Sequence, residues 1–180
     1  LNSINSTTTG NLDATGVTTI TGTASELNTL ISNEGDSGDK VNLDGDFAVT
    51  ITAGSASATH LITINAETTS IVTATAVTTI TGTAADIATL MDDEGDSGNK
   101  VNLDDDFSVT VDTGSVTAAD LNTISAKTSG TVTATNATAI TGTSTTVAAV
   151  VNDSQISVDG DYTVTLTGTA AAADIITIDG

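Results

Sequence analysis

The sequence predicts a mainly β fold, a repetitive β-solenoid-like stack with short helical turns. Three observations predict it. The chain repeats itself every 60 residues, each repeat divides into two related halves of about 30 residues, and both halves contain β-branched residues that alternate with small or polar ones. A repeat of this length is typical of stacked arrays, in which each unit buries its apolar face only against its neighbours.

The 60-residue period organises the whole chain. Residues 1–60 match residues 61–120 without a gap at more than half of their positions. A third, shortened copy occupies 121–174, and residues 175–180 open a fourth copy. Separate small β-rich domains are the alternative to a stack. An immunoglobulin-like sandwich, however, takes about 100 residues and usually contains a buried Trp, which this chain lacks.

A glycine followed by Ser or Thr marks the boundary between halves. These glycines are Gly22, Gly54, Gly82, Gly114, Gly142 and Gly168. Helix-start patterns follow them, such as Thr23‑x‑x‑Glu26 and Thr117‑x‑x‑Asp120, in which the hydroxyl caps the first turn and the acid favours its positive end. Apolar residues then recur at helical spacing, as in Leu27, Leu30 and Ile31, so we expect a short helical turn at this corner of each coil.

Strands are predicted where the period changes to two. Phe47, Val49 and Ile51 point to one side, and the same pattern recurs at 107–111 and at 162–166. The single aromatic residue of each repeat, Phe47, Phe107 or Tyr162, is expected to fill the core.

Composition excludes several functions. The formal net charge is −20, with three lysines against 23 acidic residues, so the chain lacks the basic surface that nucleic-acid binding requires. No apolar run reaches the roughly 18 residues of a membrane span. The absence of Cys excludes disulfides and thiolate chemistry. We therefore expect neither a nucleic-acid partner nor a membrane span in this segment.

No catalytic residue is predicted. His60 is the only imidazole, and its repeat equivalents are Asp120 and Asp174, so the position tolerates both residue types. The carboxylates recur in register with the repeat, as expected of a scaffold, whereas an active site normally occurs once. We expect the protein not to be an enzyme.

Two acidic loops are the candidate ligand sites. Closely spaced carboxylates separated by glycines offer the oxygen ligands that Ca²⁺ requires, although the spacing does not fit an EF-hand. A solvated acidic turn is the competing interpretation. The candidate calcium ligands are Glu34, Asp36, Asp39, Asp44, Asp46, Glu94, Asp96, Asp104 and Asp106.

Threonine supplies 40 of the 180 residues. Outward rows such as Thr163, Thr165 and Thr167 would order water if they lay on a flat sheet, which makes ice binding an alternative function. Thr is also simply a good residue for an exposed strand.

The segments TVTATNATAITGT and VTTITGTA, each followed by Ala or Ser and an acid, resemble the tandem repeats of giant acidic, Thr-rich secreted or cell-surface proteins of marine bacteria, cyanobacteria especially. The resemblance implies a structural segment of a long extracellular protein: a surface layer, filament or adhesin stalk. Its partners would be neighbouring repeats and copies of itself. The stalk of a ligand-binding adhesin or a phage fibre is the alternative.

Overall fold

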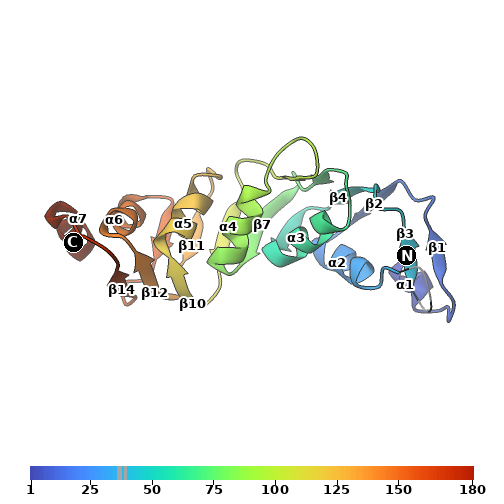
Figure 1. The fold of residues 1–180 in the computed structure, drawn as a ribbon, viewed down its shortest axis with the longest axis horizontal. Coiled ribbons are helices and arrows are strands. Elements are labelled where there is room, and N and C mark those ends of the chain that lie inside the picture. The colour runs from blue at the N-terminus through green and yellow to red at the C-terminus, as the bar shows by residue number, and fades with distance from the viewer. Residues whose placement is uncertain (36–37, 39) are drawn as a thin grey trace. The chain divides into compact units, whose positions relative to one another are not determined.

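The computed structural model describes residues 1–35, 38 and 40–180 and shows an α/β fold (Figure 1). Helices make up 32% and strands 31% of the described chain, and the strands form mostly parallel sheets. None of the helices in the described residues is both long enough and apolar enough to cross a membrane.

The expectation of a mainly β, β-solenoid-like stack is therefore wrong. The segments predicted as short helical turns are helices of eight or nine residues, apart from the four-residue α1, whereas the strands have two to six residues. The physical reason lies in the same signals. After each capping hydroxyl, apolar residues recur at helical spacing for two full turns. These segments are therefore helices that pack on one another, and not single turns at the corner of a β coil.

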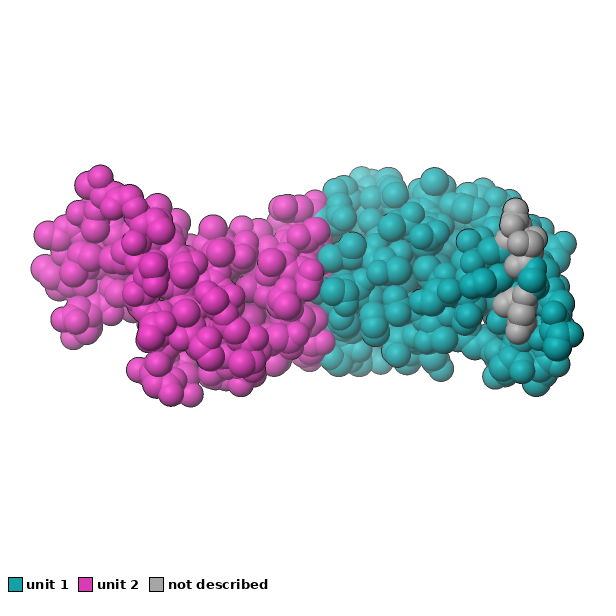
Figure 2. Space-filling model, turned by 60° about the horizontal axis from the view of Figure 1, so that its bottom comes forward, with its two compact units in different colours: residues 1–77, 93–104 teal, residues 78–92, 105–180 magenta. Residues whose placement is uncertain are grey.

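The described chain divides into two compact units, residues 1–77 with 93–104 and residues 78–92 with 105–180 (Figure 2). Their boundaries differ from those of the sequence repeats.

Unit 1 alternates strands and helices, with α1 packed on α2 and α2 on α3. Its strands pair in parallel, β1 with β3, and β2, β4, β6 and β8 in that order. The elements are α1 (Asn2–Asn5), β1 (Leu12–Ala14), β2 (Thr19–Gly22), α2 (Ala24–Ser32), β3 (Val41–Leu43), β4 (Ala48–Ile51), β5 (Gly54–Ser57), α3 (Ala58–Ala66), β6 (Val72–Thr73) and β8 (Val101–Asn102).

Unit 2 follows the same order of elements. Its strands pair in parallel as β7, β9, β11 and β13 and as β10, β12 and β14, and Figure 1 shows its helices α4 to α7 following one another in a row. The elements are β7 (Val77–Gly82), α4 (Ala84–Asp92), β9 (Ser108–Val111), β10 (Gly114–Thr117), α5 (Ala118–Ser125), β11 (Val132–Ala134), β12 (Ala137–Gly142), α6 (Ser144–Asn152), β13 (Ile156–Val158), β14 (Thr163–Leu166) and α7 (Ala172–Asp179).

The core is built from columns of aliphatic residues that meet across the parallel strands. In unit 1, Ile20 lies opposite Val49, which lies opposite Val72, which lies opposite Val101. All four are buried. Each pairing joins residues 23 or 29 positions apart, so one turn of the chain supplies one member of the column. Full burial of such a side chain contributes about 1.5–3 kcal/mol.

The predicted aromatic position is a core position in the first two repeats. Phe47 and Phe107 are almost completely buried, as the period-two pattern predicts. Tyr162 is only half-buried, because β14 is the end strand of its sheet.

The predicted helix starts are confirmed. Thr23 and Glu26 form a capping box at α2, in which Thr23 Oγ1 accepts from Glu26 N and Glu26 Oε2 accepts from Thr23 N. At α5, Thr117 Oγ1 accepts from Asp120 N. These bonds satisfy amide groups that otherwise have no partner in a first helical turn.

The glycine before the cap is required by a close approach at α6. A Cβ on Gly142 would lie 2.7 Å from Thr146 Oγ1 and 3.1 Å from Ala118 Cβ. The strand therefore passes directly into the helix with no room for a side chain.

We predict that Thr83→Ala destabilises the protein by about 1 kcal/mol, because it removes the cap of α4. Thr83 Oγ1 accepts from Asp86 N at 3.1 Å and donates to Asp86 Oδ2 at 2.7 Å. Thr89→Ala, at an exposed site on the same helix, is the matched control and should change stability by less than about 0.5 kcal/mol. Urea denaturation measures both, and equal effects would show that the cap contributes nothing specific.

Candidate functional site in the acidic loops

Two loops that follow α2 and α4 carry the first group of candidate ligands. Backbone hydrogen bonds close each loop at its base: Gly35 N donates to Val41 O at 3.0 Å, and Gly95 N donates to Val101 O at 3.1 Å. Glu34 forms a parallel bridge with Val41, and Glu94 does so with Val101. In the second loop, the sequence Glu-Gly-Asp-Ser-Gly at residues 94–98 thus starts from a hydrogen-bonded base.

One lysine covers the base of each loop. The aliphatic part of Lys40 packs over Gly35 and that of Lys100 over Gly95, where a Cβ on either glycine would meet the lysine Cγ at 3.3 Å and 3.4 Å. Lys100 Nζ lies 3.6 Å from Asp93 Oδ1, with both side chains more than one third exposed. An exposed pair of this kind contributes at most about 1 kcal/mol.

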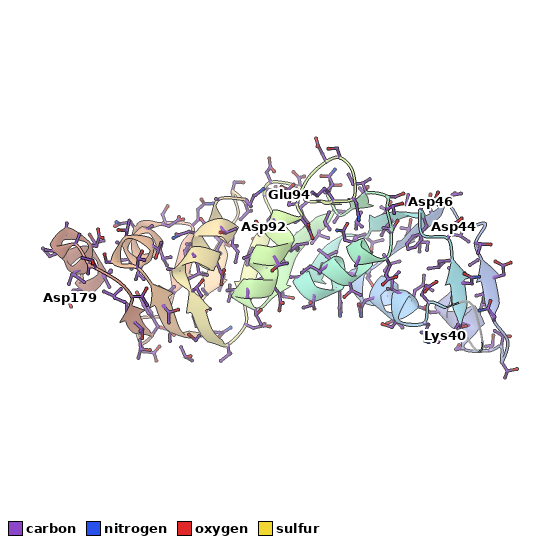
Figure 3. The ribbon with its side chains drawn as sticks, in the orientation of Figure 1. Lys40, Asp44, Asp46, Asp92, Glu94 and Asp179 are labelled. Atoms are coloured by element: carbon purple, nitrogen blue, oxygen red, sulfur yellow. The ribbon has the colours of Figure 1, made fainter. Side chains whose placement is uncertain are left out.

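The second group of candidate ligands precedes strands β4 and β9. The side chains of Asp44 and Asp46 are exposed on one turn, and Lys40 lies away from them (Figure 3). Asp104 and Asp106 are the equivalent exposed acids before β9.

The backbone carbonyls of these turns already accept hydrogen bonds. In unit 1, Thr68 Oγ1 donates to Phe47 O at 2.6 Å, Thr69 N donates to Gly45 O at 2.8 Å, and Ser70 Oγ donates to Asp46 O. In unit 2, Thr128 Oγ1 donates to Phe107 O, and Ser129 N donates to Asp105 O at 2.7 Å. Hydrogen bonds therefore join each acidic turn to a loop that lies 21 to 24 residues further along the chain.

These hydroxyl donors were not among the residues predicted to be functional. A signal for them is present: Thr8-Thr9-Gly10, Thr68-Thr69-Ser70 and Thr128-Ser129-Gly130 recur every 60 residues. In each, the first hydroxyl accepts a hydrogen bond from the amide two residues on. This local turn predicts a bend before a strand.

The predicted calcium ligands are not gathered into one site by the part of the chain that the structure describes. Asp36 and Asp39 lie outside the described residues. Among the others, no three His, Cys, Asp or Glu side chains come together in a way that would hold a metal ion. Glu34 and Glu94 are half-buried at the loop bases, and Asp44, Asp46, Asp96, Asp104 and Asp106 are exposed.

His60 and its repeat equivalents lie on helices in the first turn. His60 is the third residue of α3, Asp120 the third of α5 and Asp174 the third of α7. Asp174 Oδ2 accepts hydrogen bonds from Ser144 Oγ at 2.7 Å and from Thr145 Oγ1 at 2.9 Å, at the start of α6. These acids favour the positive ends of helices, which is a structural role.

Two exposed carboxyls have lowered pKa values, both because of neighbouring hydroxyl and amide donors. The backbone and hydroxyl groups of Thr23 hold the pKa of Glu26 below its usual value. The hydroxyl group of Thr15, and then its backbone amide, lower the pKa of Asp13. A lowered folded-state pKa means that the stabilisation is present above the usual carboxyl pKa and is lost as the pH falls through the folded-state value. The hydrogen bonds that lower the two pKa values therefore stabilise local turns of the chain.

Comparison of the chain with protein-family models, with curated proteins and with solved structures finds no match.

We predict that NaCl raises the melting temperature, because 23 acids against three lysines repel one another in the compact state. Raising the ionic strength from about 0.01 M to about 0.15 M shortens the Debye length from about 30 Å to about 8 Å. CaCl₂ at matched ionic strength should act equally if screening is the whole effect. A larger rise with CaCl₂ that Asp46→Asn and Asp106→Asn remove would contradict this and establish metal binding.

Proposed function

We propose that this chain is a non-catalytic structural repeat segment of a long extracellular protein, serving in a surface layer, filament or adhesin stalk. The observation that carries the proposal is the recurrence of one set of bonds. Thr68 donates to the carbonyl of Phe47 and Thr128 to that of Phe107, each across 21 residues.

The imidazole and carboxylate side chains also recur at equivalent positions of the repeats. His60, Asp120 and Asp174 occupy one helical position, and Glu34 and Glu94 occupy one bridge position. A catalytic site needs a single arrangement that differs from its surroundings. Duplicated positions support a role in which each repeat does the same mechanical work.

The acidic composition supports an extracellular location. Carboxylates lie on exposed turns, whereas the core contains aliphatic residues and two Phe. A strongly charged surface keeps a long repetitive chain soluble and opposes its nonspecific aggregation. The resemblance to giant acidic surface proteins of marine bacteria agrees with this location. A stalk of an adhesin or of a phage fibre would use the segment in the same way.

Ice binding is the second candidate, because threonines stand in register across neighbouring strands. Thr21 lies opposite Thr50 and Thr50 opposite Thr73 in unit 1. Thr81, Thr110 and Thr133 form the equivalent row in unit 2. Parallel strands are about 4.8 Å apart, so the hydroxyls repeat at that spacing.

A structural segment should tolerate the removal of a whole repeat. We predict that deletion of 61–120, which joins His60 to Leu121 in equivalent helices, leaves a folded protein. Its circular dichroism per residue should be unchanged, and its urea m-value should fall because less surface is exposed on unfolding. Deletion of 61–105 is the control, since it joins helix α3 to the turn before β9 and should abolish cooperative unfolding. Loss of folding in both variants would contradict the proposal.

A measurement of thermal hysteresis distinguishes the two candidate functions. Ice binding predicts thermal hysteresis that Thr50→Tyr and Thr110→Tyr reduce, because a bulky ring interrupts each row. The structural proposal predicts no hysteresis in the unmodified chain. Hysteresis that survives both substitutions would assign ice binding to another surface.

A further inference from the structure

Three equivalent turns of the repeats begin with an aspartate. Each begins three residues before the aromatic residue of its repeat, and the pairs are Asp44-Gly45, Asp104-Asp105 and Asp159-Gly160. All six residues are exposed. Because the turns of the first two repeats are exposed as well, the exposure of the third is a property of the turn itself and not of its place in the chain.

The carboxylate of Asp159 lies against the amide of the next residue. Gly160 N donates to Asp159 Oδ1 at 2.8 Å. This hydrogen bond folds the Asp159 side chain back on its own main chain, so the Gly160 nitrogen and Asp159 Cγ are the two ends of a five-membered ring that lacks one bond. Between Asp44 and Gly45 the described residues form no such hydrogen bond.

The glycine at position 160 is not required by the fold. A Cβ built on Gly160 meets no atom within 4 Å, and the φ of Gly160 is not positive. Packing and backbone conformation would therefore accept another residue here. What glycine provides is a nitrogen that no neighbouring Cβ shields. In the equivalent pair of the second repeat, the Cβ of Asp105 stands next to the corresponding nitrogen.

We propose that Asp159-Gly160 is a site of spontaneous isoaspartate formation, a covalent modification that needs only water. In the first step the Gly160 nitrogen gives its proton to solvent and forms a bond to Cγ of Asp159 in its neutral carboxylic acid form. The carboxyl hydroxyl takes a proton from solvent and leaves as water, which closes a succinimide ring. No atom is oxidised or reduced.

Water opens the ring in the second step. Attack at Cγ restores the ordinary aspartate. Attack at the main-chain carbonyl carbon of Asp159 breaks its bond to the Gly160 nitrogen and leaves Gly160 linked through Cγ, which is isoaspartate. The water that was lost is regained, so the modified chain has the same mass as the original one.

The modification lengthens a short link between two strands. β13 ends at Val158 and β14 begins at Thr163, and the two strands belong to different sheets. Isoaspartate moves the Cβ of Asp159 from the side chain into the main chain, so the link gains one carbon atom. We expect amide hydrogen exchange in residues 163–166 to be faster in the modified chain, because the pairing of β14 with β12 loses its exact register.

The inference does not depend on the proposed structural function, because the reaction needs only the turn itself. It adds a property to that function. A structural segment that is retained for a long time accumulates a slow modification, whereas a protein that is rapidly replaced does not.

Tryptic mapping of the aged 180-residue chain tests the proposal. The chain has no Arg, and its lysines are Lys40, Lys100 and Lys127, so trypsin places each of the three aspartate turns in a different peptide. Fragmentation by electron transfer gives ions specific to isoaspartate and separates Asp159 from Asp179 in the last peptide. We expect isoaspartate to form about tenfold faster at Asp159 than at Asp44, because the reacting atoms are already held together.

Two matched substitutions separate the site from the rest of the chain. Gly160→Ala should slow the reaction at Asp159 by about tenfold, because the added Cβ shields the nitrogen. Gly45→Ala makes the same change at an equally open position and should leave the rate at Asp159 unchanged. Circular dichroism shows that both variants are folded. In water enriched in heavy oxygen, each passage through the succinimide should add one labelled oxygen at Asp159.

Unfolding in urea is the control for the conditions of ageing. It removes the folded contact, so both Asp-Gly pairs should then react at the same rate. Equal rates at Asp44 and Asp159 in the folded chain would overturn the inference. So would a folded chain without isoaspartate at Asp159 under conditions that modify the unfolded chain, or a rate at Asp159 that Gly160→Ala leaves unchanged.

Discussion

The structure depends on parallel pairing between strands of successive turns of the chain. Each turn must deliver an aliphatic residue to the same place in the column, as Ile20, Val49, Val72 and Val101 do in unit 1. Because the strands have only two to six residues, no single turn buries enough apolar surface to be stable alone. The length of a turn varies between 23 and 29 residues along this column.

The same constraint decides where charge is allowed. Inward positions of the strands must be apolar, so the described acidic residues lie mainly on loops, turns and helix ends, with Asp13 in β1. The hydrogen bonds that Thr68 and Thr128 donate to the Phe carbonyls then hold the acidic turns against the next turn of the chain. Most of the described acidic residues are thus exposed to solvent, where salt screens the repulsion among them.

Local structure was predictable from the sequence, and the fold class was not. Thr23, Thr83 and Thr117 predicted the helix starts, and the alternation around Phe47 and Phe107 predicted buried strands, because caps and period-two patterns act over a few residues. The fold class failed because the length of helices such as α2 and α4 was underestimated and the strands were taken as dominant. The hydroxyl donors of the Thr68 and Thr128 loops were missed because their acceptors are backbone carbonyls 21 residues away, which no side-chain pattern reveals. Closeness in sequence did not gather the described carboxylates into a metal site.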